Sequence, residues 1–96
     1  MATFITMVKF TEKGVQDVRD TTKRAAAFKT AAKKMGVKVI GTYWTLGKYD
    51  GMMVFSAPDM ETGTAAMLKL ASEGNVTTTT VRAYEASEME KIVGLL

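Results

Sequence analysis

The sequence predicts one small α+β domain over residues 1–96, with a strand, a helix, two strands, a helix, a strand and a C-terminal helix in that order. Two observations carry this prediction. Apolar residues recur at helical spacing in two long segments and follow strand patterns between them. A Gly-Lys dipeptide at 47–48 joins two apolar-rich runs in the manner of a hairpin turn. Two crossovers around a central hairpin give the ferredoxin-like layout βαββαβ, an antiparallel sheet with both helices on one side.

The first strand is expected over Thr3–Phe10 and the first helix from about Gly14 to Met35. The strand has apolar side chains on both faces, with Phe4, Val8 and Phe10 alternating with Ile5 and Met7. The helix carries one apolar stripe, formed by Val18, Thr22, Ala25, Phe28, Ala32 and Met35. Gly36 stands where a helix C-terminus favours glycine.

The hairpin is expected to pair Val37–Leu46 with Tyr49–Ala57. A turn of two or four residues places two sets of side chains on opposite faces, whereas a three-residue turn would reverse the pairing. One face then carries the polar groups that a cleft would use, on Tyr43, Thr45, Asp50, Met52 and Ser56. The more apolar face is expected under the helices and carries Ile40, Thr42, Trp44, Tyr49, Met53 and Phe55.

Pro58 ends the hairpin, and Asp59 is expected to cap a second helix that runs to about Ser72. After Gly74-Asn75 the last strand spans Val76–Tyr84, and Ser87 is expected to cap a helix that ends near Leu96. Strands this apolar on both faces are unfavourable in a monomer. We therefore expect a second copy to cover the open sheet face and to form a barrel-like dimer with an internal cavity.

Composition excludes several kinds of chemistry. The chain has no cysteine and no histidine, which rules out disulfides, thiolate nucleophiles, the Ser-His-Asp relay and imidazole ligation of metal or haem. No loop has calcium-site spacing, so neither a metal nor another cofactor is expected. The net charge of +3 is spread along the chain, and no nucleic-acid partner is expected. Without a signal peptide or a membrane-spanning run, a cytoplasmic location is expected.

Four segments in order give the chain a clear resemblance to the GYD-domain family over nearly its whole length. They are TEKG at 11–14, YWTLGKYD at 43–50, APD at 57–59 and GNVTTTTVRAY at 74–84. The resemblance implies a dimeric α+β barrel, a superfamily whose other branches include cofactor-free monooxygenases, isomerases and haem enzymes. The GYD branch itself has no common established activity. The family typically has an acidic residue before APD, whereas this chain has Ser56, a departure that bears on any role of that acid as a base or ligand.

The candidate ligand-binding residues are Tyr43, Thr45, Asp50, Thr78, Thr80 and Arg82. Arg82 shares a face with Thr78 and Thr80 and offers a guanidinium fork to a carboxylate or phosphate if that face points into the cleft. Each residue also has a simpler interpretation. Asp50 would cap backbone amides or pair with a cation, Tyr43 would pack, the threonines would suit a strand by their branched shape, and Arg82 would form a surface or inter-subunit ion pair.

Three hypotheses follow from these residues. The first is a homodimeric small-molecule binding or regulatory module with a cleft on the sheet face. The second is a cofactor-free enzyme of the isomerase or monooxygenase type, in which Asp50 accepts a proton while Tyr43 or Arg82 stabilises negative charge. The third is an assembly element whose cavity is filled by Met52, Val54 and their neighbours. The first ranks ahead of the enzyme because the sequence shows neither a nucleophile nor a poised acid-base pair.

Overall fold

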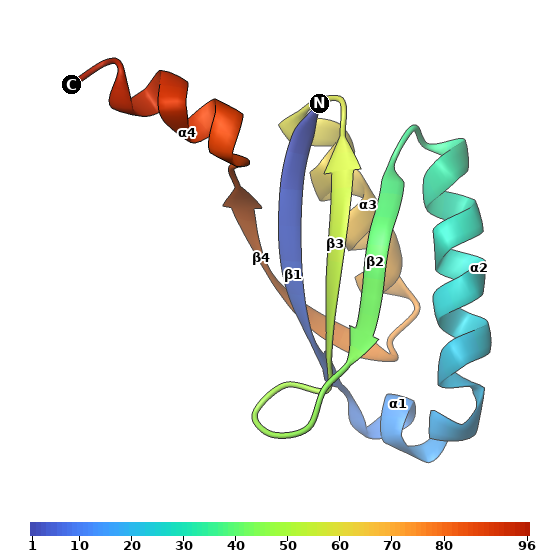
Figure 1. Cartoon of the computed structure of the whole chain (residues 1–96). Coiled ribbons are helices and arrows are strands. Elements are labelled where there is room, and N and C mark those ends of the chain that lie inside the picture. The colour runs from blue at the N-terminus through green and yellow to red at the C-terminus, as the bar shows by residue number, and fades with distance from the viewer.

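The computed structural model describes residues 1–96 and has the expected α+β, ferredoxin-like order of strands and helices (Figure 1). A short 3₁₀ helix at Val18–Asp20 joins the first two helices. The elements are β1 (Ala2–Phe10), α1 (Glu12–Gln16), α2 (Thr21–Lys34), β2 (Lys38–Trp44), β3 (Gly51–Ala57), α3 (Met60–Ser72), β4 (Val76–Ala83) and α4 (Ala86–Val93).

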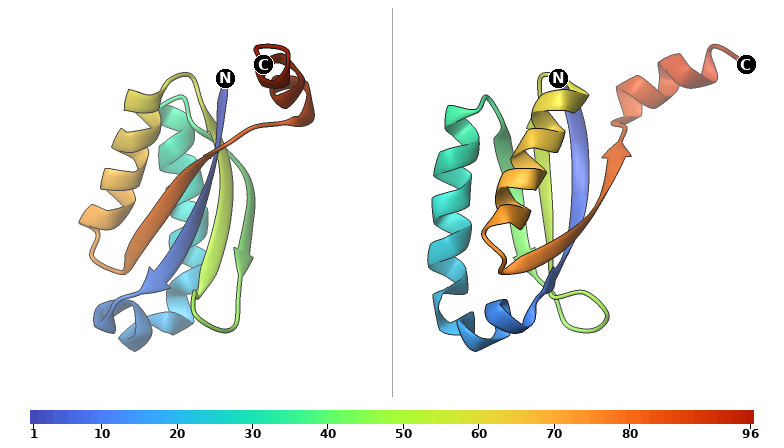
Figure 2. Two further views of the ribbon diagram at one scale, coloured as in Figure 1. Left: turned by 90° about the vertical axis from the view of Figure 1, so that its left-hand side faces the viewer. Right: turned by 180° about the vertical axis from the view of Figure 1, so that it is seen from behind.

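The four strands form one antiparallel sheet in the order β2-β3-β1-β4, and α2 and α3 lie side by side on one of its faces (Figure 2). The core fills the space between the helices and the sheet. Its centre is a stacked pair of rings, Phe4 and Phe55, whose centroids are 5.1 Å apart. The other buried apolar side chains are those of Phe28, Ala32, Val37, Val39, Met53, Ala57, Ala66 and Met67. No helix covers the opposite face of the sheet.

The continuous helix expected from Gly14 to Met35 is wrong, because the chain breaks at Asp17. Helix α1 crosses beneath the end of the sheet, and α2 then runs up along the sheet, so one straight helix cannot serve both directions (Figure 1). Val18 and Thr22, both expected on the buried stripe, are exposed; Val18 falls in the 3₁₀ turn and is 41% exposed. Phe28 and Ala32 are buried as expected, and Gly36 follows the helix with a φ of 85°.

The hairpin has the expected parity. The loop between β2 and β3 spans residues 45–50 and is longer than the Gly-Lys turn suggested, and at its base the Thr45 N–H donates to the Asp50 carbonyl at 3.0 Å. Met53 and Phe55 are buried under the helices, whereas Thr42 and Trp44, expected with them, lie on the edge strand β2 and are exposed. Ile40, expected with them, is 55% exposed because a bulge between Val39 and Gly41 gives the inward position to Val39.

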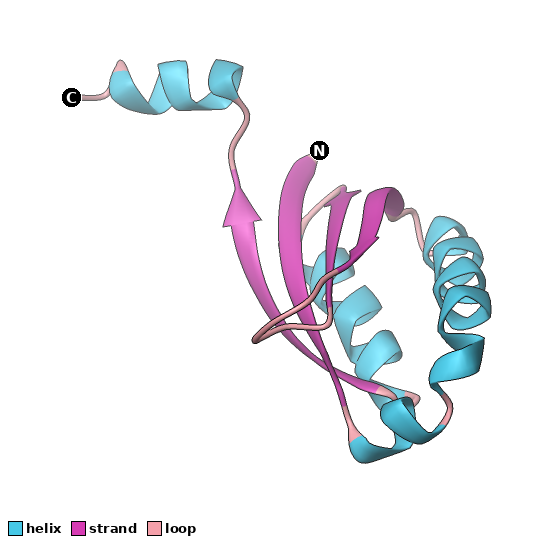
Figure 3. Ribbon diagram, turned by 60° about the horizontal axis from the view of Figure 1, so that its bottom comes forward, coloured by secondary structure: helices cyan, strands magenta, loops and turns pink.

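Helix α4 continues beyond the end of β4 and stands apart from the other helices (Figure 3). Its N-cap is Glu85 and not Ser87, because Glu85 and Glu88 form a reciprocal capping box. The helix lies toward the uncovered side of the sheet (Figure 2). None of its residues is buried, and its exposed apolar side chains are Met89, Ile92 and Val93, followed by Leu95 and Leu96.

The turn after β1 is fixed by contacts between two distant segments. The Thr11 N–H donates to the Asn75 carbonyl at 3.0 Å, and the Thr11 hydroxyl donates to the Gly74 carbonyl at 2.6 Å. The same hydroxyl accepts the Gly14 N–H and thereby caps α1. The backbones approach so closely that a Cβ at Gly14 would lie 2.0 Å from the Asn75 oxygen. Only glycine fits at this position.

Replacing Gly14 by alanine should therefore force α1 away from the α3–β4 turn. We expect Gly14→Ala to lower the free energy of unfolding by about 1–3 kcal/mol, as for other overpacked sites. Urea denaturation followed by circular dichroism measures this change. Gly94→Ala is the matched control, because Gly94 has helical dihedral angles and alanine there should have little effect. Equal stability of the two variants would contradict the close approach.

Candidate functional site

A hollow of about 80 Å³ lies between α2 and the sheet, near the end of β1 and the start of β3. Its walls are mainly apolar, with Val8, Phe10, Phe28, Met53 and Leu70 among them. Polar groups enter from four segments, and they include Thr21, Arg24, Asp50, Glu73 and Asn75. Mostly apolar walls with a few convergent polar groups are typical of small-molecule sites.

Asp50 holds the end of β1 at two points. Its N–H donates to the Val8 carbonyl at 2.8 Å, and its Oδ2 accepts the Phe10 N–H at 2.8 Å. The β1–β3 ladder ends at the Val8–Gly51 pair, so the carboxylate supplies the acceptor that a further strand residue would have offered. Asp50 therefore serves the backbone, as one of the two sequence interpretations proposed, and it also borders the hollow.

The neighbours of Asp50 close the hairpin and tie it to α2. The Thr45 hydroxyl donates to the Tyr49 carbonyl at 2.7 Å inside the loop, and Thr45 does not border the hollow. The Trp44 indole Nε1 donates to the Thr21 hydroxyl at 3.0 Å. This bond joins the edge strand β2 to the first residue of α2, beside the hollow.

Four polar residues of the hollow were not identified from the sequence: Thr21, Arg24, Glu73 and Asn75. Among them, Arg24 is the one with a buried unpaired nitrogen. Its Nη1 donates to the Asp17 carbonyl at 2.6 Å, at the break between α1 and α2. Its Nη2 is buried and has no hydrogen-bond partner. The helical spacing could have identified Arg24 from the sequence, because Arg24 lies four residues before the buried Phe28 and so shares the inward face of α2.

The other candidates occupy different places. Tyr43 borders the hollow from the edge strand, but its ring lies over Gly41, where an added Cβ would come within 3.0 Å of it. In β4 the partners of Thr80 and Arg82 are Thr6 and Phe4, whose side chains are buried on the helix side of the sheet. Thr78 has the same parity in β4. Tyr43 and the β4 candidates therefore point to opposite faces.

A second hollow, between α3 and β4, contains two of those β4 residues, Thr80 and Arg82. The Thr80 hydroxyl donates to the hydroxyl of the fully buried Thr6 at 2.9 Å, and Thr6 donates to the Thr79 carbonyl at 3.4 Å. These bonds pair β1 with β4. Thr78 borders neither hollow.

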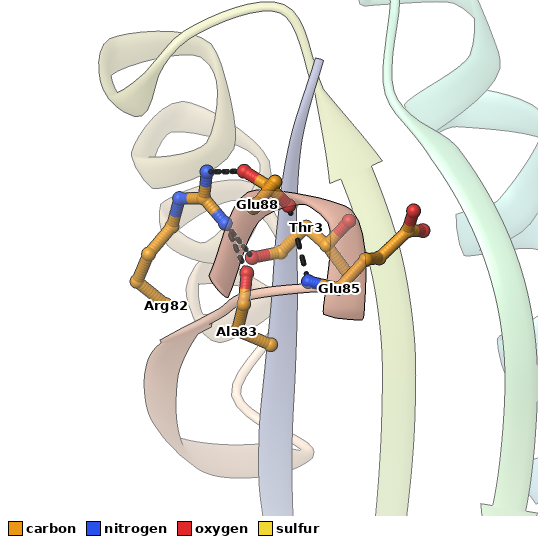
Figure 4. Close-up of polar contacts among 5 residues, drawn as sticks. All are labelled: Thr3, Arg82, Ala83, Glu85 and Glu88. Carbon is orange, nitrogen blue, oxygen red and sulfur yellow. Dashed lines mark hydrogen bonds and ion pairs between the residues drawn. The ribbon is translucent and has the colours of Figure 1, made fainter. Parts of the chain in front are cut away.

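Arg82 connects the sheet to the start of α4 (Figure 4). Its Nη2 lies 2.9 Å from Glu88 Oε2, and its Nη1 donates to the carbonyls of Thr3, at 3.2 Å, and Ala83. The guanidinium also lies over the Tyr84 ring at 4.5 Å. The hydrogen bond from Arg82, followed by that from the Glu85 N–H, lowers the pKa of the Glu88 carboxyl below its ordinary value. Arg82 thus orients the C-terminal helix.

The remaining sequence features are placed as follows. Ser56 is buried in β3, opposite Thr3 and Lys38. No three acidic side chains lie close enough together to hold a metal ion. None of the helices has the length and apolar character needed to cross a membrane.

Comparison with known proteins finds similarity over most of the chain to a family model, to a curated protein and to a solved structure. The family model described as the GYD domain matches residues 4–93. The glutamine synthetase and cystathionine beta-lyase binding protein of Thermus thermophilus is 33% identical over 90 residues, which cover 93% of this chain and 95% of that protein. The crystal structure of TTHA0845, also from Thermus thermophilus, is similar with a TM-score of 0.59 and 20% identity. This match covers 90% of this chain and 96% of that one, and it supports the fold alone.

The contacts of Asp50 predict a graded loss of stability on substitution. Asp50→Ala removes the acceptor of the Phe10 N–H and should lower the free energy of unfolding by about 1.5–3 kcal/mol, the range for a hydrogen bond to a charged group. Asp50→Asn keeps a side-chain oxygen and should cost less than half as much. Denaturant titration measures both. Asp20→Ala is the control, since this exposed carboxylate makes only a 3.9 Å contact with Lys23. A loss for Asp50→Ala no larger than that of the control would refute this role.

The Arg82–Glu88 pair predicts that the position of α4 depends on pH. Because the folded-state pKa of Glu88 lies below the ordinary 4.5, the pair contributes fully above pH 4.5 and is lost as pH falls through the lowered value. Backbone amide NMR signals of α4 should shift on titration from about pH 6 to about pH 3. The Glu88→Gln variant should lack this transition, and Glu90→Gln should retain it. An unchanged titration in Glu88→Gln would show that the pair does not orient α4.

Proposed function

We propose, from the premise that this chain belongs to the GYD-domain family, that it is a homodimeric binding module that regulates a partner protein. Family membership rests on the model that matches residues 4–93. A relative of nearly the same length, 33% identical, is named for binding glutamine synthetase and cystathionine beta-lyase. By analogy, a metabolic enzyme is the kind of partner that we assign to this chain.

The observation that carries the proposal is the apolar face of the sheet that no helix covers. Ile5 lies at its centre, opposite Val54 on β3 and Val81 on β4. Met7 follows on the same face, opposite Met52. These five side chains come from three adjacent strands and form one continuous strip. Strips of this kind on soluble proteins mark protein contact sites.

A second copy of the chain is the occupant that fits this face. The strip has no charged side chain among its five residues, so two copies related by a two-fold axis present the same apolar surface to each other. A stable dimer buries about 800 Å² on each partner, which is the scale of a sheet face. Helix α4 extends toward this side (Figure 2), and its exposed Met89, Ile92 and Val93 enlarge the apolar surface offered to the second copy.

A small organic ligand between the two sheets belongs to the same proposal. Tyr43, on the uncovered face, is the candidate that would line that space. The other candidates would contact a ligand elsewhere. A ligand on the helix side of the sheet would be contacted by Thr78, Thr80 and Arg82, and a ligand at the hairpin loop would be contacted by Thr45. Asp50 as the proton acceptor of a cofactor-free enzyme is the alternative. It ranks lower, because one carboxylate oxygen of Asp50 is engaged by the Phe10 N–H.

The dimer is tested by placing a charge at the centre of the strip. Wild-type protein should sediment as a dimer, and Ile5→Lys should sediment as a folded monomer, because a buried unpaired ammonium opposes association. Thr22→Lys adds the same charge on the exposed surface of α2 and should remain dimeric. A monomeric wild type, or an Ile5→Lys dimer of unchanged affinity, would reject the sheet-face interface.

The partner is tested with the same variants. Glutamine synthetase and cystathionine beta-lyase from the same cells, each purified, are mixed with the chain and analysed by sedimentation. We expect a complex with at least one enzyme, together with a change in that enzyme's activity. Thr22→Lys serves as the dimeric control. If neither enzyme binds, the assignment of the partner fails, whereas the dimer is judged separately.

A further inference from the structure

We infer that the hollow between α2 and the sheet is a binding site for a small zwitterionic amino acid with an apolar side chain. The hollow lies between α2 and the sheet, and of the five residues of the strip assigned to the dimer only Met52 borders it. The inference therefore goes beyond the proposed function and does not depend on a partner protein or a second copy.

Arg24 supplies the group that would bind the carboxylate. Its Nη1 is anchored to the Asp17 carbonyl, which fixes the position of the guanidinium in the wall of the hollow. Its Nη2 is buried and makes no hydrogen bond. Buried polar groups in proteins are nearly always paired, so an unpaired cationic nitrogen indicates a missing acceptor. Arg24 and Thr21 also belong to the first turn of α2, where the helix dipole favours an anion.

Asp50 supplies the group that would bind the ammonium. Its Oδ2 accepts the Phe10 N–H, whereas its second oxygen accepts no hydrogen bond from the chain. Asp50 and Arg24 border the same hollow, yet the two ion pairs of the structure, Lys23–Asp20 and Arg82–Glu88, include neither of them. Glu73, the other carboxylate of the hollow, belongs to an exposed residue.

These two unpaired charges select the ligand. A simple anion would be attracted by Arg24 and repelled by Asp50. A simple cation would be attracted by Asp50 and repelled by Arg24. A molecule that carries both charges satisfies both residues. The rest of the wall is apolar, with Phe28 and Met53 almost fully buried, so the remaining part of the ligand should be apolar. A volume of about 80 Å³ favours a short side chain.

L-Valine is the probe, and the change in fluorescence of Trp44 is the signal. Trp44 is the only tryptophan of the chain and borders the hollow. Two analogues separate the charges: isovalerate lacks the amino group, and isobutylamine lacks the carboxylate. Wild-type protein should bind L-valine about tenfold or more tightly than either analogue, since each analogue leaves one of the two half-buried charges unpaired. No binding of L-valine, or equal binding of isovalerate, would overturn the inference.

Two variants test which residue binds the carboxylate of the ligand and which binds its ammonium group. Arg24→Met keeps the aliphatic stem and should weaken L-valine and isovalerate about tenfold, with little effect on isobutylamine. Asp50→Asn keeps an acceptor for Phe10 and should weaken L-valine and isobutylamine, with little effect on isovalerate. Arg19→Met, an exposed arginine away from the hollow, is the control and should bind L-valine as the wild type does. Wild-type affinity in a folded Arg24→Met protein would reject the site.

Discussion

The end of β1 is the point on which the rest of the structure depends. At Phe10 and Thr11 the strand leaves the sheet, and its two N–H groups must still find acceptors. The Asp50 carboxylate serves the first, and the Asn75 carbonyl serves the second. The loop of the β2–β3 hairpin and the turn between α3 and β4 are therefore both fastened to the same two residues.

The contacts at Phe10 and Thr11 form a junction that accounts for residues in three of the four segments that the chain shares with the GYD-domain family. Thr11 caps α1 and contacts Gly74, Gly14 permits the approach to Asn75, and Asp50 completes the end of the ladder. The fourth segment, at Asp59, acts locally as the N-cap of α3 by accepting the Thr62 N–H. A shared structural need accounts for these residues, and none of them requires a catalytic role. The hollow arises beside the junction because its walls include Phe10, Asp50 and Asn75.

The sequence was sufficient to predict the order of strands and helices, the hairpin parity and the helix ends at Gly36 and Asp59, because these depend on residues close together in the chain. Three local details were wrong for physical reasons. Val18 fits the helical stripe, but the chain must change direction at Asp17. Ile40 fits the strand alternation, but a bulge reverses it. Ser87 is a good N-cap, but Glu85 and Glu88 form a reciprocal pair two residues earlier.

The candidate site was harder to predict, because it depends on pairings between distant residues. The face of the β4 candidates is fixed by the pairing of Thr80 with Thr6, across most of the chain. Strand β3 contributes to both sides of the sheet: Met53 is buried on the helix side, and Met52 has the opposite parity and pairs with Met7 on the uncovered face, although both border the hollow. A ligand that stiffens β3 from the helix side would stabilise the surface offered to a second copy. By linkage, dimerisation would then raise ligand affinity by the same factor. In the proposed dimer, the two faces of the sheet would thus couple ligand binding to association in a chain without histidine or cysteine.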